Sequence, residues 1–195
     1  MLKRPILPLM LLMMALIVVF FLLNLLLGSV HIPLRSVCSI LAGSTDESVV
    51  WQNIIWKSRV PQALTALVAG AGLSVSGLQM QTVFRNPLAG PSVLGISSGA
   101  SLGVACVVLL SGAVGGVALS HLGYLGEVAL SLAAIVGAMS VMALIVYVSM
   151  KVRGNVTLLI IGVMIGYVAN AIIGVLKFFS VEEDIRAYVI WGLGS

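Results

Sequence analysis

Apolar runs alternate with short polar stretches along this chain, and this alternation is its main feature. A helix of roughly 20 apolar residues crosses the hydrocarbon layer of a membrane, and five runs come close to that length or exceed it. These runs cover residues 6–27, 60–82, 93–110, 128–150 and 156–179. The pattern predicts an all-α fold, a polytopic bundle of five transmembrane helices in which residues 1–195 form a single domain.

The first run has two interpretations. Lys3 and Arg4 precede it, and a short basic stretch before an apolar run is also typical of a secretory signal peptide. The run is longer than the ~7–15 residues of a signal-peptide core, and no small-x-small cleavage site follows it. A retained first span is favoured, with a signal peptide as the alternative.

The polar segments between the runs are predicted to be connections. Residues 28–58 form an external loop with some interfacial helix, and Trp51 and Trp56 near its end are residue types found at the membrane–water boundary. The second span then starts at Val60, with Pro61 tolerated in its first turn. Further connections are expected at residues 84–91, 111–126, 151–155 and 180–186.

Composition agrees with a membrane location. Hydrophobic residues make up 61% of the chain and charged residues 8%, against about 45–50% and about 25% in soluble domains. The net charge of +4 comes from scattered basic residues, without a patch that would bind nucleic acid. Cys38 and Cys106 lack metal-ligand spacing, and no phosphate-binding glycine loop is present. We therefore expect no bound metal, ATP or other cofactor.

Lysine and arginine divide evenly between the two sides of the predicted bundle. With the N-terminus inside, the inner set is Lys3, Arg4, Arg85, Lys151 and Arg153, and the outer set is Arg35, Lys57, Arg59, Lys177 and Arg186. The basic flank of the first span and the density of charge in short loops favour a cytoplasmic N-terminus. The prediction is a multi-pass protein of the inner (cytoplasmic) membrane, surrounded by lipid.

Small and polar residues interrupt the apolar runs. In the fifth span, Gly162, Gly166, Asn170 and Gly174 recur every four residues and form one slanted ridge of a helix. One interpretation is helix packing, because small residues let backbones approach closely. The other is that Asn170 and its neighbours line a path for a solute, since polar groups in a membrane are costly without a role. Both stay open.

Candidate catalytic chemistry is sparse. His31 and His121 lie far apart in predicted loops, and no Ser/His/Asp or paired-carboxylate arrangement can be assembled. The acidic cluster 182–184 is interpreted as a solvated turn, with partner contact as the alternative. No charged residue lies deep in a predicted span, which disfavours a secondary transporter. The chain is expected not to be an enzyme.

Several stretches from Arg59 onward carry a recognisable pattern. Arg59-Val60-Pro61-Gln62 is similar to an Arg-Leu-Pro-Arg signature, and residues 84–100 contain the highly specific run Asn86-Pro87-Leu88-Ala89. Residues 76–81, 158–166 and 191–195 also fit. Through these residues the chain resembles the FecCD-type permease subunits that import iron-siderophores, haem and vitamin B12. The resemblance is weak before Arg59 and strong after it.

This resemblance implies a non-catalytic subunit of an ATP-driven importer that works by alternating access. A second permease subunit, as in a homodimer, would complete the path. Separate ATP-binding cassette subunits would hydrolyse ATP on the inside, and an external binding protein would deliver the substrate.

The resemblance also implies roles for individual residues. Asn86 and Leu88 match a cytoplasmic gate, and Asn155 and Val156 fall where other inner gate residues sit. Arg59 matches an arginine that pairs with an acidic residue of the binding protein, while Gln62 replaces a second such arginine, for which Lys57 would compensate. The fifth span would line the path, with its inward positions at Gly162, Gly166 and Asn170.

The family's expected length exceeds that of this chain. A subunit with about ten spans of about 20 residues each needs more than 195 residues. We therefore expect this sequence to be the N-terminal part of a permease, without transport activity alone. Siderophore, haem and cobalamin remain open as substrates. A non-transporting structural or assembly protein, an inactive permease fragment and an integral membrane enzyme are the rival interpretations.

Overall fold

The computed structural model describes residues 6–44, 47–87, 89–113, 124–152 and 154–194. It divides into two compact units, Met1–Ser74 and Val75–Ser195. The boundary between them falls within one long helix, α4 (Val60–Phe84), so each unit contains one part of that helix. The predicted single domain is therefore described as two units, and whether they form one domain stays a prediction.

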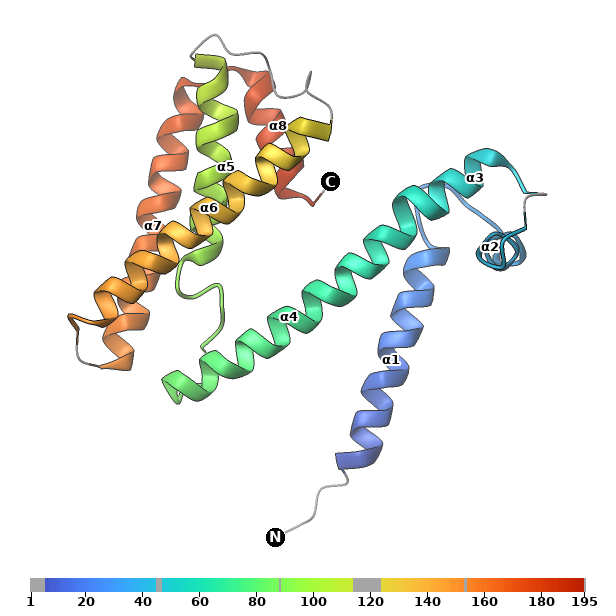
Figure 1. Ribbon diagram of the computed structural model, residues 1–195, viewed down its shortest axis with the longest axis horizontal. Coiled ribbons are helices and arrows are strands. Elements are labelled where there is room, and N and C mark those ends of the chain that lie inside the picture. The colour runs from blue at the N-terminus through green and yellow to red at the C-terminus, as the bar shows by residue number, and fades with distance from the viewer. Residues whose placement is uncertain (1–5, 45–46, 88, 114–123, 153, 195) are drawn as a thin grey trace. The chain divides into compact units, whose positions relative to one another are not determined.

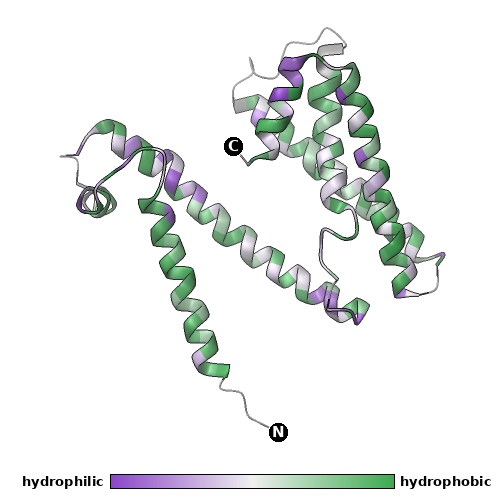
Figure 2. Ribbon diagram, turned by 180° about the vertical axis from the view of Figure 1, so that it is seen from behind, coloured by the Kyte–Doolittle hydropathy of each residue, from purple (hydrophilic) through white to green (hydrophobic). Residues whose placement is uncertain are grey.

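The first unit combines two long apolar helices with a short helical connection (Figure 1). It contains α1 (Ile6–Leu26), α2 (Leu34–Leu41), α3 (Val49–Ile54), the π-helical turn η1 (Ile55–Arg59) and the start of α4. Figure 2 shows α1 as hydrophobic over almost its whole length, and Leu25 is its one buried residue among those described. A small core joins Ile32, Val37, Ile40 and Ile55.

The predicted second span starts where α4 starts, at Val60, but helical structure also precedes it. The helix is continuous from Val49 to Phe84, so that it begins well before Val60. Pro61 lacks an N–H and its ring crowds the carbonyl four residues earlier. The wide turn η1 lies directly before it, and there the Val60 N–H donates to the Ile55 carbonyl oxygen, five residues back. Because this π-turn accommodates the proline, the helix does not have to begin at it.

The second unit is built around α5 (Ile96–Ala113). It packs against α6 (Tyr124–Ser149), α7 (Asn155–Phe179) and α8 (Glu182–Gly192), and its residues Val104, Ala105, Val108 and Leu109 form a buried cluster with Ile173 of α7. The expected connection at 111–126 is too long, since helix extends to Ala113 and resumes at Tyr124. Residues 114–123 lie outside the described part.

Within this unit, glycines bring helix backbones close together. A Cβ on Gly99 of α5 would lie 2.8 Å from the carbonyl oxygen of Gly137 in α6. A side chain on Gly103, one turn further along α5, would collide with the Ala133 carbonyl oxygen. Small residues at such crossings are typical of helices that pack in a membrane. The packing interpretation therefore holds for the glycines of α5.

The helices of the described residues are those of a multi-pass membrane protein. Four are long and apolar enough to cross a membrane, namely Ile6–Leu26, Val49–Phe84, Leu125–Ser149 and Asn155–Phe179. The third predicted run corresponds to a shorter apolar helix, Ile96–Leu110. Large hydrophobic side chains on these helices are widely exposed, for example Met139 at 65% and Val168 at 60%. Such surfaces suit an apolar solvent, and the predicted all-helical bundle is confirmed.

Candidate functional site

The connection between α4 and α5 is packed into the core of the second unit. Phe84, Ala89 and Leu94 are buried, and they join Val141 and Ile145 of α6 in one cluster. Backbone hydrogen bonds turn the segment on itself, including Ala89 N–H to the Asn86 oxygen at 3.1 Å. Irregular backbone at membrane depth is tolerated where protein buries it. The run that carries the family resemblance is therefore an anchored element of the fold.

The end of this connection lies directly against α7. Gly95 has a φ of +73°, a conformation that favours glycine. A Cβ on Gly95 would lie 2.7 Å from the Gly162 carbonyl oxygen, and a Cβ on Gly162 would lie 2.8 Å from the Leu94 Cα. Gly162 and Gly166 are buried in this contact. Gly162 and Gly166 therefore pack closely against the connection between α4 and α5.

A polar cleft opens beside this contact. Its volume is about 220 Å³, and the helical ridge of α7 forms one wall through Gly166 and Asn170. The Asn170 Nδ2 donates to the Gly166 oxygen at 2.9 Å and lies 3.4 Å from the Ser98 Oγ of α5. Asn170 is exposed in the described chain. The other lining residues are Ser92, Val93, Gly95, Ser98, Val163 and Tyr167.

Six of the eight lining residues were not among the predicted site residues, and for two of these six the sequence contained a signal. Ser98 belongs to a small-residue cluster in the third run, and Tyr167 lies four residues after Val163, on the same side of α7 as the ridge. The sequence does not predict that Ser98 lies beside Asn170, because these two residues are 72 positions apart in the chain.

Asn155 and Val156, two of the predicted gate residues, are the first two residues of α7 and do not line this cleft. Asn155 is the first residue of that helix, and its Nδ2 donates to the Val83 oxygen near the end of α4 at 2.9 Å. The Asn86 N–H, three residues further, donates to the Gln81 oxygen at 3.2 Å. Val156 is 68% exposed, and Leu88 lies outside the described residues. The structure thus joins Asn155 to the segment that contains Asn86, a contact the sequence did not predict.

The two predicted docking residues have different environments. Arg59 is only 5% exposed, and its guanidinium donates to backbone oxygens at the end of α1. Lys57, two residues earlier in η1, is exposed. A docking role for either residue stays a prediction.

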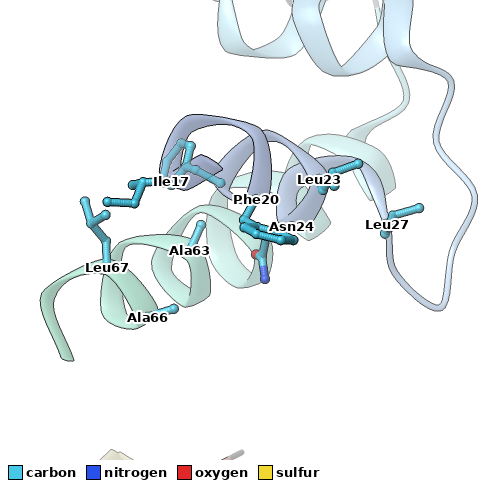
Figure 3. A pocket seen from close by; sticks show the side chains of 9 residues that line it. Ile17, Phe20, Leu23, Asn24, Leu27, Ala63, Ala66 and Leu67 are labelled. Atoms are coloured by element: carbon cyan, nitrogen blue, oxygen red, sulfur yellow. The ribbon is translucent and has the colours of Figure 1, made fainter. Parts of the chain in front are cut away.

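An apolar groove lies between α1 and α4 in the first unit (Figure 3). Its volume is about 630 Å³, and Asn24 is the one polar side chain among the residues that line it. Figure 3 shows the Asn24 amide among the aromatic and aliphatic side chains. None of the predicted site residues lines this groove. The other lining residues are Ile17, Phe20, Phe21, Leu23, Leu27, Ala63, Ala66 and Leu67.

Among the residues that the structure describes, no group of three or more His, Cys, Asp and Glu side chains could hold a metal ion. The polar groups of the second-unit cleft are an amide, two hydroxyl groups of serine and the phenol of Tyr167. Such groups can form hydrogen bonds with a passing solute, and they provide neutral contacts along the wall of the cleft.

Known proteins resemble this chain over most of its length. The vitamin B12 import system permease protein BtuC of Pectobacterium atrosepticum is 34% identical over 144 residues, which cover 74% of this chain and 40% of that protein. The hemin transport system permease protein HmuU of Yersinia pestis is 34% identical over 155 residues, which cover 78% of this chain and 43% of that protein. The chain therefore spans about two-fifths of the length of these relatives.

A solved structure gives the same result at the level of the fold. It is an inward-facing conformation of a metal-chelate type ABC transporter, with a TM-score of 0.65 and 26% identity, covering 91% of this chain and 50% of that one. Residues 16–195 match the FecCD transport family. This match includes the α4–α5 connection, the glycine contacts of α7 and the polar cleft. The chain belongs to the FecCD transport family.

Proposed function

We propose that this chain is part of the permease subunit of an ATP-driven importer for iron-siderophore, haem or cobalamin, and that it provides part of the translocation path by alternating access. The observation that carries the proposal is the family match over residues 16–195. Relatives named for vitamin B12 and hemin transport, and a metal-chelate type transporter of similar fold, support this class of substrate.

In this proposal the path runs along α7. Asn170 and the small residues of its ridge face the cleft, where a large chelate passes over a surface of glycine, serine and amide groups. Short side chains leave room, and neutral polar groups offer hydrogen bonds without the high cost of a charge in the membrane. Gly162 serves the path indirectly, by allowing the α4–α5 connection to lie against the helix.

The inner gate lies where α7 begins. The Asn155 Nδ2 is hydrogen-bonded to the Val83 oxygen, so that a movement of α7 relative to the end of α4 breaks one contact. Asn86, Leu88 and Val156 complete the gate. Alternating access then consists of opening this end while the outer end closes, driven by ATP hydrolysis in the partner subunits. The permease itself catalyses no reaction.

The proposed topology has a cytoplasmic N-terminus in the inner membrane. The α4–α5 connection and the start of α7 then face the cytoplasm, on the side of the ATP-binding cassette subunits. Residues 28–58 face outward, where the exposed Lys57 is available to an acidic residue of a binding protein. A second permease subunit, as in a homodimer, completes the transporter.

The test is uptake by whole cells. The full product of the gene is co-expressed with its ATP-binding subunits and binding protein in cells that lack their own permeases, and accumulation of a ferric siderophore, haem and cobalamin is measured. Uptake of one substrate, abolished when the partner ATPase is inactivated, supports the proposal and identifies the substrate. If none accumulates although the protein is present in the membrane, a structural or assembly role is favoured instead.

A matched pair of variants tests the proposed path. Asn170→Ala removes the amide from the cleft, whereas Ile172→Ala changes an exposed residue of the same helix that does not line it. We expect slower uptake for N170A, with normal uptake for I172A and equal amounts of both proteins in the membrane. Equal uptake by the two variants would exclude the cleft from the path.

A further inference from the structure

Arg59 is a buried cation held by backbone oxygens. Its Nη1 donates to the Leu25 oxygen at 2.8 Å and to the Leu26 oxygen at 3.0 Å, and its Nη2 donates to the Val30 oxygen. The side chain is 5% exposed. Among the residues that the structure describes, no carboxylate pairs with it. A charge so deeply buried is costly unless its donors are satisfied, and here three carbonyl groups satisfy them.

Two of these carbonyls, those of Leu25 and Leu26, belong to the end of α1, where they have no partners within the helix, and the third belongs to Val30 in the segment that follows. The last carbonyl groups of any helix lack intrahelical donors, and α1 ends at Leu26. A cation is also favourable there, because the C-terminus of a helix has a partial negative charge. Arg59 therefore acts on α1 as a C-terminal cap that comes from a residue more than 30 positions away.

Two local features make room for this cap. The π-turn η1 buries Ile55 and Arg59 while it leaves Trp56, Lys57 and Ser58 exposed. Gly28 lies beside the guanidinium, and a Cβ at this position would be 2.8 Å from the Arg59 Nη2 and 3.1 Å from its Cζ. The absence of a side chain at residue 28 is therefore what allows the guanidinium to reach the carbonyls.

The contact has consequences for residues 30–58. It joins η1 to the end of α1, and Ile55 of the same turn forms the core with Val37 and Ile40 of α2. We propose that Arg59 and Gly28 form a clamp that fixes this segment on the end of α1, and that Arg59 is a positioning residue and not a docking charge. Where the proposed function holds, the cation presented to the binding protein is then Lys57.

The clamp and a docking charge make opposite predictions for conservative changes. Arg59→Lys keeps the charge, but one ammonium group cannot reproduce the fork that reaches three carbonyls. Gly28→Ala changes no charge, yet its methyl group displaces the guanidinium. A docking charge tolerates both changes, whereas a clamp tolerates neither. Lys57→Gln is the matched control, since it removes a neighbouring cation whose side chain is exposed.

The readout is the reactivity of a buried thiol. Ser36 of α2 is 8% exposed, and Ser36→Cys is nearly isosteric. The full-length protein carries this reporter in a background with Cys38→Ser and Cys106→Ala, which removes the two thiols of this chain, and any cysteine outside residues 1–195 is replaced as well. Maleimide labelling is followed in permeabilised membranes, so that the result does not depend on which side the segment faces. Neither transport nor a binding protein is needed for this measurement.

We expect R59K and G28A to raise the labelling rate about tenfold, since hydrogen bonds to a charged group contribute about 1.5–3 kcal/mol each and 1.4 kcal/mol corresponds to tenfold. K57Q labels at the rate of the unchanged protein. In the double variant G28A/R59Q, the alanine adds nothing to the effect of R59Q, because its target is gone. If G28A alone accumulates poorly, the comparison of R59Q with G28A/R59Q is still informative.

The clamp is overturned if R59K or G28A labels like the unchanged protein, or if the two changes in the double variant simply add. Binding of the external protein is measured separately on the same membranes. Weaker binding in K57Q at an unchanged labelling rate supports docking through Lys57. If no variant affects binding while R59K and G28A still expose the thiol, the clamp stands and the docking part of the proposed function fails.

Discussion

In the first unit, α1 and the start of α4 expose most of their side chains, and a buried arginine joins the end of α1 to η1. In the second unit, α5 packs closely against α6 and α7, and glycine backbones meet where α5 crosses α6 and where the α4–α5 connection contacts α7. Lipid tails are as apolar as leucine, so burial of apolar surface alone does not hold helices together in a membrane. Helices are therefore joined by other means in the two units. In the first unit the contact is made by a charged side chain, and in the second by close approach of backbones.

This difference predicts where a side chain can be added. A glycine at a backbone crossing has no free space around it, whereas a glycine on an exposed helix face does. Gly70 of α4, in the first unit, has nothing within 4 Å of an added Cβ, while Gly137 of α6 would meet the Gly99 oxygen and, at 3.0 Å, the Gly103 N.

The largest expected effect is that of Gly137→Leu. Four added carbon atoms would have to enter a contact between two backbones, where no side chain can move aside. We expect a loss of more than about 4 kcal/mol, seen as failure of the protein to accumulate in the membrane or as loss of its thermal transition in detergent. Gly174→Leu is the control, because residue 174 has open space around it. A normal melting temperature for G137L would disprove the crossing.

A smaller effect is expected for Gly162→Ala. One methyl group would lie 2.8 Å from the Leu94 Cα, and overpacking of this kind costs about 1–3 kcal/mol. The measurement is the midpoint of thermal unfolding in detergent. Gly70→Ala, in the first unit, should leave the midpoint unchanged or raise it slightly, since alanine is the better helix former. Equal midpoints for the two variants would remove the distinction between the units.

Much of this architecture was predictable from the sequence, for a physical reason. The spans at 6–27, 128–150 and 156–179 match α1, α6 and α7 closely because long apolar runs can satisfy their backbone in lipid only as helices. The continuation of the helix upstream of Val60 was not predictable, because Pro61 is expected in a first turn and here a π-turn compensates for its missing N–H. Local rules of helix initiation do not include this possibility.

The candidate site was predictable only in part. The spacing of Gly162, Gly166 and Asn170 indicated one ridge of α7, and the structure places Gly166 and Asn170 on the cleft. The roles of Gly95 and Val83 depend on contacts with residues about 70 positions away, which no local pattern reports. For Arg59, a charge and a motif are visible in the sequence, but neither indicates that the guanidinium is buried.

Asn155→Ala tests a polar contact within the unit that otherwise relies on glycine. The change removes the hydrogen bond to the Val83 oxygen, which contributes about 1 kcal/mol. If this bond holds the gate closed, the open population should rise about fivefold. The measurement is labelling of a cysteine placed at Val156, with and without N155A, in vesicles that contain the complete transporter. An unchanged labelling rate would assign the bond to the fold and not to the gate.

The smallest expected effect concerns Lys177, at the end of α7. Its Nζ lies 4.7 Å from the centre of the Tyr188 ring of α8, and a cation over an aromatic face contributes about 0.5–1 kcal/mol at an accessible site. The same lysine lies in the last turn of α7, where a positive charge also interacts favourably with the helix dipole. Replacing Tyr188 by leucine removes the ring but keeps the charge in the last turn of α7, whereas Lys177→Met removes both contributions of the lysine. A lower melting temperature for K177M than for Y188L would show that the dipole contributes separately, and equal temperatures would assign the whole effect to the ring. In either case the shift should be smaller than that of G162A, because the contact of Gly162 with the α4–α5 connection depends on backbone approach and not on charge.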